Sequence, residues 1–363
     1  MDAKIGLLAH NKIASDEAAR LRHMPSSAHR GTPTKDSFNS RTLNKGSRAK
    51  LERYQELFFI LQTQPQYLAR LFRKNREQGV VDADQKRLES LVMSTFAHAQ
   101  KQREEYYFLK LLAKSVQEEC NACGAIQEFQ RGSYFFDRLF RTYTRAPRDR
   151  KFLRQTFTPL IRNMILDDDQ LDLESDPRQI YRFLLNDEEL RTGTCSRDPN
   201  LPQGIAIKEP DVRAIFVKNL QDVKELADHF LETLQEAIPR LPFGVRYVTR
   251  QMFDSLSERY PQEDQRHLLR AVTFWTWKHY IKPIFTSPED SGIIERSVDP
   301  AGKRNLNMMA LVLNQLIMGR EFDEEHFYLK PLNRYFTGTG FSKMDDIRAQ
   351  CKHNKHSACL YLS

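Results

Sequence analysis

Four arginines stand among aromatic residues in the stretch FQRGSYFFDRLFRTYTR, residues 129–145. They are Arg131, Arg138, Arg141 and Arg145. A guanidinium is planar, permanently charged and carries five hydrogen-bond donors, so it is suited to binding phosphate and carboxylate oxygens. Because such a charge is costly to bury, each of these side chains is expected either to lie in water or to be directed at a partner.

Helical periodicity separates Arg131 from the other three arginines. A helix that begins near Ser133, with Ser133 as its N-cap, places a hydrophobic stripe on one face, made of Phe135, Phe136, Leu139, Phe140 and Tyr143. The later arginines then lie largely on the opposite face. Arg131 precedes the cap and is followed by Gly132, whose backbone freedom allows a loop to present the guanidinium outward.

Motifs of known catalytic sites are missing from the chain. It has no GxSxG, HExxH, P-loop or kinase signature, and its 14 glycines leave little room for Gly-rich nucleotide loops. The acidic run DDDQLDLESD, residues 167–176, suits either a divalent cation or a solvated exit from a helix, and we favour the exit. We therefore expect no active site of the chain's own and no cofactor.

Five cysteines do not form a disulfide framework in a chain of this length, which indicates a reducing compartment. CNAC at 120–123 has the spacing of a zinc pair but no second pair and ends a helical pattern. The segment CKHNKHSAC at 351–359 offers Cys351, His353, His356 and Cys359 as ligands, but no hydrophobic pattern supports it. For both segments the favoured interpretation is that they bind no metal.

The whole chain has 363 residues, 40% of them hydrophobic, which suffices for one large or two medium globular domains. No apolar run approaches the roughly 20 residues of a membrane helix, and the N-terminus lacks the apolar stretch of a signal peptide. Ten Lys or Arg and four Asp or Glu lie in residues 1–50, so this segment carries +6 of the formal net charge of +8. We expect a disordered basic tail over 1–50, with contact of the tail to an anionic membrane or to nucleic acid as the alternative. We expect a cytoplasmic or peripheral protein and no nucleic-acid partner, because the folded part carries little of the positive charge.

Helical periodicity dominates the chain after residue 50. Residues 212–238 place apolar side chains at spacings of three and four along one long helix. Strand-like alternation is essentially absent, and the polar segment 187–210 is the expected connector. The fold class is therefore all-α and irregular. The other expected helices cover 51–75, 84–120, 133–145, 151–166, 178–186, 245–259, 264–281 and 303–318.

Several stretches in order resemble the Ras GTPase-activating (Ras-GAP) domain, nearest to its fungal Ras-GAP and IQGAP branch. The stretch around Arg131 resembles the arginine-finger segment, where Arg-Gly or Arg-Ala precedes a helix. The resemblance covers roughly residues 50–340, which leaves 341–363 unmatched. It is carried further by QREEYYFLKLL (102–112), TYTRAPRDRKFLRQTFTPLIRNMI (142–165), DLESDPRQIYRFL (172–184), IPRLPFGVRYV (238–248), KPIFTSPE (282–289) and YLKPLN (328–333).

The resemblance implies a central catalytic subdomain, a smaller helical extra subdomain and a GTP-bound Ras-family GTPase as the partner. Arg131 is then the finger inserted in trans, Gly132, Ser133 and His279 shape and support its loop, and GTP and Mg²⁺ belong to the partner. The residues implied at the GTPase surface are Arg138, Lys282, Pro283, Asn307 and Leu311.

This chain also departs from the family pattern. In WKHYIKPIFTSP (277–288), His279 stands where the family has the arginine that supports the finger loop, and Lys282 stands where it has asparagine. Asn307 and Leu311 stand where members carry lysines that face the GTPase, although Leu311 also suits the core of an apolar helix. Two hypotheses follow: an active GTPase activator, or a module that binds a GTP-loaded GTPase as a scaffold without accelerating hydrolysis.

Overall fold

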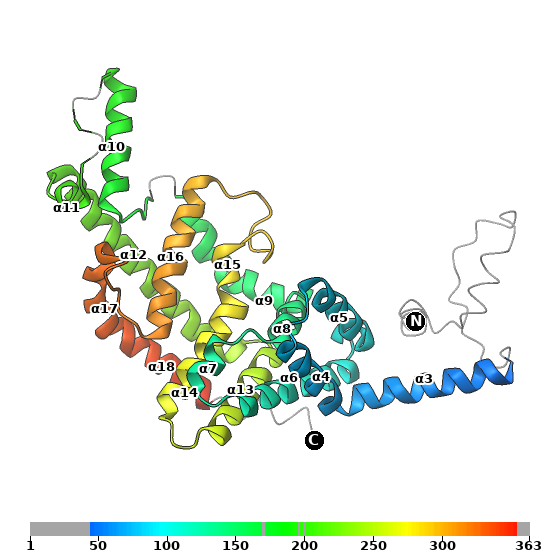
Figure 1. Cartoon of the computed structure of the whole chain (residues 1–363). Helices are drawn as coiled ribbons and strands as arrows, with labels where there is room; N and C mark the ends of the chain where they lie inside the picture. Colours follow the sequence, from blue (N-terminus) through cyan, green and yellow to red (C-terminus); the bar gives the residue numbers. More distant parts are fainter. Residues whose placement is uncertain (1–43, 169–170, 195–196, 199–200, 354–363) are drawn as a thin grey trace, which may run out of the picture. The chain divides into compact units, whose positions relative to one another are not determined.

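The structure, a computed structural model, describes residues 44–168, 171–194, 197–198 and 201–353. Within these ranges the chain forms helices and no β-strand, which confirms the all-α prediction (Figure 1). The chain divides into two compact units, Met1–Tyr143 and Thr144–Ser363, which are described separately below. Most of the basic segment 1–50 lies outside the described residues, as do Cys195, His356 and Cys359.

The first unit is built around α6 (Gln102–Ala122), which packs along α4 (Pro65–Glu77). The long helix α3 (Lys45–Thr63) leads into α4 and extends away from it (Figure 1). The core of this unit includes the fully buried aromatic rings of Phe72, Phe96 and Phe108. The remaining elements of this unit are α5 (Asp82–Thr95), the short turn η2 (Ala97–Ala99), α7 (Ile126–Arg131) and α8 (Phe135–Thr144).

Two helices that periodicity predicts as continuous are interrupted in this unit. The expected helix 51–75 breaks at Gln64, whose backbone (φ −114°, ψ 78°) is held out of the helical region by the following proline. The expected helix 84–120 breaks at Ala97, His98 and Ala99, which all have positive φ values of 47° to 53°. Residues with a Cβ rarely adopt positive φ. Neither the residue types nor the hydrophobic pattern of this stretch therefore predicted the break.

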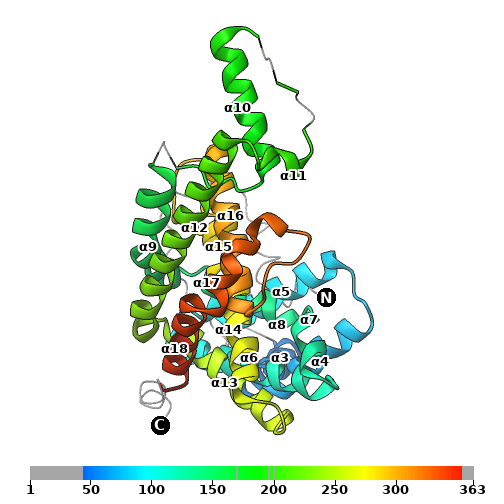
Figure 2. The ribbon, with the colours of Figure 1, turned by 90° about the vertical axis from the view of Figure 1, so that its left-hand side faces the viewer.

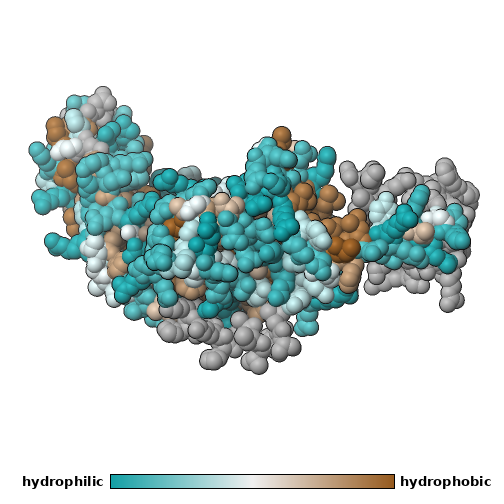
Figure 3. All heavy atoms as spheres, turned by 60° about the horizontal axis from the view of Figure 1, so that its bottom comes forward, coloured by the Kyte–Doolittle hydropathy of each residue, from teal (hydrophilic) through white to brown (hydrophobic). Residues whose placement is uncertain are grey.

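Hydrophobic side chains are exposed on α3 and α4. Figure 3 shows a mainly hydrophilic surface with hydrophobic atoms gathered beside α3. The exposed hydrophobic side chains on these two helices include Leu57, Phe59, Ile60, Tyr67 and Leu71. This patch belongs to the first unit.

The second unit is centred on α12 (Pro210–Ala237) and α16 (Pro300–Met318), which lie side by side (Figure 2). Phe230 of α12 makes ring contacts with Phe157, Trp277 and Phe285 at centroid distances of 5.7 Å. Around these helices lie α9 (Pro147–Thr158), η3 (Pro159–Leu166), α13 (Phe243–Arg259), α14 (Gln265–Thr276), η5 (Trp277–Ile281), α15 (Pro283–Thr286), η4 (Ile238–Arg240), η6 (Phe327–Leu332) and α17 (Asn333–Thr337).

A smaller helical part of the second unit has a hydrophobic cluster of its own. α10 (Pro177–Thr192) and α11 (Gln203–Ala206) pack on the start of α12 through Ile180, Tyr181, Leu185, Ala206 and Val212. Figures 1 and 2 both show α10 projecting beyond the end of α12. The extra subdomain that the resemblance implies stays a prediction. The connector 187–210 therefore also contains the end of α10 and the whole of α11.

The acidic run 167–176 is held to the second unit through its backbone. Asn305 of α16 accepts a hydrogen bond from the Leu173 N–H (3.0 Å) and donates to the Leu171 carbonyl (2.9 Å). Asn219 of α12 donates to the carbonyl of Glu174 (2.6 Å). The run does leave a helix, as expected, but Leu173 and Ser175 are fully buried, so it is not a solvated segment throughout.

The segment after residue 340 continues the second unit as far as it is described. α18 (Thr339–His353) packs against α12, α14 and α16, with Met344 and Ile347 buried. Hence a helix covers about half of the segment 341–363 that the resemblance left unmatched. Among the described residues, no helix is long and apolar enough to cross a membrane.

Candidate functional site

Arg131 is the last residue of the short helix α7 and not a loop residue, which corrects the sequence-based expectation. Its side chain is exposed. Within the described residues, no hydrogen bond or ion pair holds its guanidinium. The chain turns away from the helix at Gly132, which has extended backbone angles (φ −60°, ψ 153°). An exposed arginine thus stands at the point where a helix ends.

The ring of Tyr134 covers the α-carbon of Gly132. A Cβ placed on Gly132 would lie 2.2 Å from both Cζ and Oη of Tyr134, far inside van der Waals contact. The glycine is therefore required here for close approach of a ring and not for an unusual φ. This requirement is stricter than the Arg-Gly or Arg-Ala that the family resemblance allows.

Two hydrogen bonds meet at the carbonyl of Phe129, two residues before Arg131. The Gly132 N–H donates to it at 3.2 Å, and the Tyr134 hydroxyl donates to it at 3.0 Å. The carbonyls of the last turn of a helix lack partners within the helix, so a side-chain donor satisfies one of them here. The donors come from both sides of the turn that follows Arg131, and together they close it.

Tyr134 is buried among groups from four helices. Its ring stacks on Phe129 of α7 (5.1 Å, 23°) and on Phe136 of α8 (5.2 Å, 6°). The guanidinium of Arg76 in α4 lies 5.5 Å from the ring centroid, and the thiol of Cys123, next to α6, lies 3.5 Å from the hydroxyl. Burial raises the pKa of Tyr134 well above its ordinary value, so the hydroxyl remains a hydrogen-bond donor.

The Arg76 guanidinium over this ring belongs to an ion pair. Both Nε and Nη2 of Arg76 bind Oε2 of Glu119, at 2.9 and 2.7 Å, and the Glu119 side chain is only 3% exposed. The hydrogen bond to Glu119 raises the pKa of Arg76 despite its partial burial. Since a buried carboxylate that loses its partner is strongly destabilising, this pair fixes Arg76 beside Tyr134.

The start of α8 differs from the sequence-based expectation. The helix begins at Phe135, and Tyr134 is the residue before it, so the Ser133 cap was wrong by one position. Oδ2 of Asp137 accepts from the Tyr134 N–H at 3.1 Å, while the Asp137 N–H donates to the Tyr134 carbonyl. This reciprocal pair resembles a capping box and holds Tyr134 at the helix start. Ser133 is exposed beside it.

The hydrophobic face of α8 is confirmed. Each of its five predicted side chains is at most 7% exposed: Phe135, Phe136, Leu139, Phe140 and Tyr143.

Arg138 is engaged within its own unit. Its Nη1 lies 2.7 Å from Oδ1 of Asp82 and 2.9 Å from Oε1 of Gln85, and its Nε lies 3.4 Å from Oε2 of Glu89. All three partners belong to α5. The hydrogen bond to Asp82 raises the pKa of Arg138 and lowers the pKa of Asp82. The structure thus gives Arg138 a role in holding α8 to α5, and contact with a GTPase stays a prediction.

His279, Lys282 and Pro283 lie at the junction of η5 and α15 in the second unit. His279 is 7% exposed and its ring lies 5.3 Å from that of Trp275. Lys282 and Pro283 are partly exposed, and Lys282 N–H donates to the Trp277 carbonyl at the end of a π-helical turn. Arg131 belongs to the other unit, so the proposed support of the finger by His279 remains a prediction.

Asn307 and Leu311 lie one helical turn apart on α16. Asn307 is exposed, and Leu311 is partly exposed, whereas Leu306, Met309 and Leu313 of the same helix are buried. Leu311 is therefore not a fully buried core residue, and the two positions share the open side of α16. They could meet a partner, but neither carries a charge.

Two groups of described side chains consist of residue types that can ligate a metal. Cys120 and Cys123 are both buried at the end of α6, and burial raises the pKa of each thiol, which disfavours the thiolate that binds zinc. Asp323, Glu325 and His326 lie close together, but they are largely exposed side chains of a kind that often cluster without an ion. Neither group suggests a metal site.

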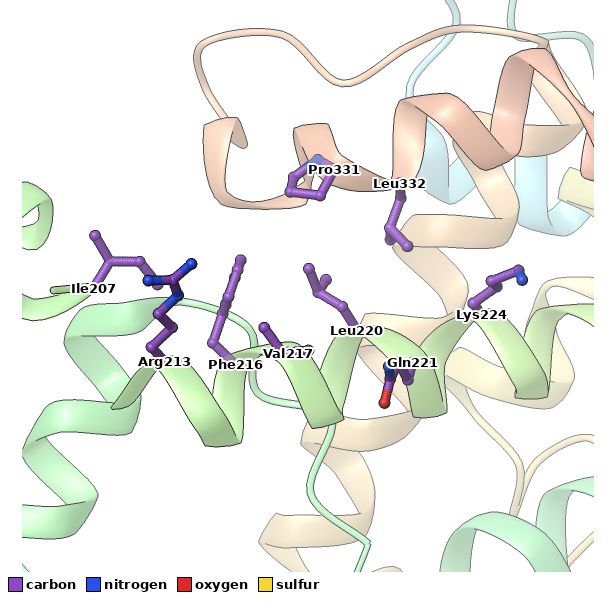
Figure 4. A pocket seen from close by; sticks show the side chains of 9 residues that line it. All are labelled: Ile207, Arg213, Phe216, Val217, Leu220, Gln221, Lys224, Pro331 and Leu332. Carbon is purple, nitrogen blue, oxygen red and sulfur yellow. The ribbon is translucent and has the colours of Figure 1, made fainter. Parts of the chain in front are cut away.

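An open pocket of about 390 Å³ lies on the second unit between α12 and η6. Figure 4 shows Phe216, Val217 and Leu220 of α12 pointing toward Pro331 and Leu332. No carboxylate, imidazole or thiol is among its described lining residues. Among these lining residues, Lys224 alone carries a side chain of the kind used in acid–base or nucleophilic catalysis.

The residues around Tyr134 were not found by sequence reasoning. Arg76 lies on α4, Glu119 lies on α6 and Cys123 follows α6. Helical periodicity gives no information about which helices meet. One signal was available: an aromatic residue two positions after an Arg-Gly pair, immediately before a helix. Its meaning depends on a ring orientation that spacing alone does not specify.

Comparison with known proteins gives a family match. A family model described as GTPase-activator protein for Ras-like GTPase matches residues 111–318. The Ras GTPase-activating-like protein IQGAP2 of Homo sapiens is 27% identical over 349 residues, which are 93% of this chain and 22% of that protein. IQG1 of Candida albicans is 30% identical over 358 residues, 92% of this chain and 21% of that protein.

A third relative, the Ras GTPase-activating-like protein rgaA of Dictyostelium discoideum, is 25% identical over 350 residues, which are 96% of this chain and 41% of that protein. The chain thus spans less than half the length of each of these relatives.

Proposed function

The chain belongs to the family of GTPase activators for Ras-like GTPases, and from this membership we propose that it accelerates GTP hydrolysis by a Ras-family small GTPase. Arg131 is the group that it inserts in trans. The observation that carries this proposal is an exposed guanidinium, without a partner among the described residues, at the end of a helix whose following turn is closed by hydrogen bonds.

The chemistry follows from the charge that develops during phosphoryl transfer. A small GTPase alone stabilises the charge on the transferring phosphate incompletely, and an arginine supplied by a partner increases the rate by about 10³–10⁵ in characterised pairs. A guanidinium is suited to this because it keeps its charge and presents donors in a fixed plane. GTP and Mg²⁺ are held by the partner, so the chain needs no cofactor.

The partner is proposed to be bound in its GTP form, since only that form carries the phosphate that Arg131 meets. We further propose a cytoplasmic protein that the basic segment 1–50 can recruit to the plasma membrane, because that segment carries most of the formal positive charge.

A second candidate function is a scaffold that binds a GTP-loaded GTPase without accelerating it. Three departures from the family pattern favour it. His279 replaces the supporting arginine, and Asn307 and Leu311 replace lysines on the open side of α16. Loss of positive charge at a surface that meets an acidic partner weakens association.

Single-turnover GTP hydrolysis separates the two functions. Ras-, Rho- and Rap-type GTPases are loaded with GTP and mixed with excess wild-type chain, Arg131→Ala or Arg191→Ala. Arg191 is an exposed arginine in the last turn of α10, so its variant controls for the loss of one exposed charge. Binding to the GTP and GDP forms is measured in parallel.

The activator is expected to accelerate at least one GTPase by orders of magnitude, with the acceleration lost in Arg131→Ala and kept in Arg191→Ala. Selective binding of the GTP form with no acceleration by the wild-type chain would establish the scaffold instead.

A further inference from the structure

The turn that carries Arg131 is supported from within its own unit. In the family resemblance this support comes from an arginine at the position of His279, which is in the other unit. The first unit contains a different device: the Tyr134 ring on Gly132 and the Tyr134 hydroxyl on the Phe129 carbonyl.

We propose that Tyr134 is the positioning residue of the Arg131 turn, acting through its hydroxyl hydrogen bond to Phe129 and its ring contact with Gly132. This inference rests on the function proposed above, in which Arg131 is the finger. Tyr134 itself does not meet the GTPase reaction; it restricts the directions in which Arg131 can point.

The position of Tyr134 is determined more firmly than that of an ordinary turn residue. Its backbone N–H is bound by Asp137, its ring stacks on Phe129 and on Phe136, and Arg76 lies over the ring. Arg76 is in turn held by the buried carboxylate of Glu119. Such a chain of contacts leaves few rotamers open to the tyrosine.

The consequence for Arg131 is geometric. Phe129 precedes it by two residues and Gly132 follows it directly, and both are joined to the same side chain. Movement of the arginine backbone therefore requires that the Tyr134 hydroxyl bond breaks or that the ring leaves Gly132. The exposed Arg131 side chain thus starts from a fixed backbone, as preorganised transition-state stabilisation requires.

The test uses Tyr134→Phe, which removes the hydroxyl and keeps the ring. Tyr143→Phe is the matched control, because Tyr143 is also buried in this unit and its hydroxyl also binds a side chain, that of Glu105. Two readouts are compared: the maximal single-turnover rate at saturating chain, and trypsin cleavage after Arg131, followed by mass spectrometry and normalised to cleavage after Arg191.

Cleavage after Arg131 requires that the turn opens locally. The cleavage rate therefore measures how firmly Tyr134 holds the turn, and this measurement needs no GTPase. We expect Tyr134→Phe to raise this cleavage about 5- to 10-fold, the value of one hydrogen bond, while Tyr143→Phe leaves it unchanged. The maximal rate should fall by a similar factor with an unchanged half-saturation concentration. In an Arg131→Ala background the rate effect of Tyr134→Phe should vanish, because the residue acts through the arginine.

Unchanged cleavage and rate in Tyr134→Phe, or an equal effect of Tyr143→Phe, would overturn the proposal. Failure of the proposed function gives a different pattern. In that case the wild-type chain accelerates no GTPase, whereas the cleavage comparison still decides whether Tyr134 holds the Arg131 turn.

Discussion

The ring of Tyr134 lies so close to the α-carbon of Gly132 that the space for a Cβ is filled, with 2.2 Å between that position and the phenol oxygen. The same oxygen donates to the carbonyl of Phe129. A single tyrosine therefore contacts the chain on both sides of Arg131.

Gly132→Ala should destabilise the first unit by about 1–3 kcal/mol, since the new methyl group must displace a packed ring. Denaturant unfolding measures this loss. Gly204→Ala is the matched control, because nothing lies within 4 Å of its Cβ position and it is in a helix, where alanine is neutral or stabilising. Equal stability of the two variants would show that the Tyr134 ring does not occupy this space.

Arg138→Ala should lower the free energy of unfolding measured in denaturant, although only modestly, because it removes ion pairs that are partly screened by water. The double variant Asp82→Asn, Glu89→Gln should have a similar effect, since it removes the partners from the other side. A loss of GTPase binding in Arg138→Ala without any loss of stability would instead place Arg138 at the partner surface.

Asn305→Ala should lower the free energy of unfolding by about 2–4 kcal/mol. The change removes the side chain that binds the Leu173 N–H and the Leu171 carbonyl, and leaves both groups without a partner. Asn307→Ala is the control on the same helix. Asn307 is exposed, so its replacement should change the unfolding free energy by about 0.5 kcal/mol at most. Thermal or denaturant unfolding of both variants checks the difference.

Glu174→Gln should stabilise the second unit at neutral pH. Burial, with Asp176 and Asp172 nearby, raises the pKa of Glu174 in the folded chain. The folded state therefore holds this proton to a higher pH than the unfolded state does. Stability falls as the pH rises from the ordinary value of 4.5 through the raised pKa, and it stays lower above that range. The glutamine variant should lack this fall.

Glu289→Gln gives the opposite sign and serves as the control. Hydrogen bonds from backbone N–H groups, among them that of Val298, lower the pKa of Glu289. The stabilisation of the folded state by the Glu289 carboxylate is therefore complete above the ordinary pKa of a glutamate. It is lost as the pH falls through the lowered pKa of Glu289. The free energy of unfolding of each variant is compared with that of the wild-type chain across the acidic range. As the pH rises, this difference should increase for Glu174→Gln and decrease for Glu289→Gln.

Periodicity predicted those parts of the fold that depend on a hydrophobic face. The stripe of α8 was found because its five side chains recur at helical spacing, and all five are buried. Periodicity failed where the backbone leaves the helix for other reasons. Gln64 precedes a proline, and Ala97 to Ala99 adopt positive φ, which no residue type in that stretch requires.

The site itself was only partly predictable. Arg131 and Gly132 stand in a local motif, so they could be proposed from the sequence. Their support depends on Tyr134, Arg76 and Glu119, whose meeting results from the packing of α4, α6 and α8. The same holds for Arg138. Its place on the polar face of α8 could be predicted, but its contact with the carboxylates of α5 could not.

The most direct measurement is the maximal single-turnover rate of GTP hydrolysis by a GTPase that responds to the wild-type chain, compared for wild type, Arg131→Lys and Arg131→Ala. We expect Arg131→Ala to lose about 10³-fold or more of this rate, and Arg131→Lys to be strongly impaired as well, because an ammonium lacks the planar array of donors. The proposed role of Arg131 would be wrong if Arg131→Ala accelerated hydrolysis as well as the wild-type chain does.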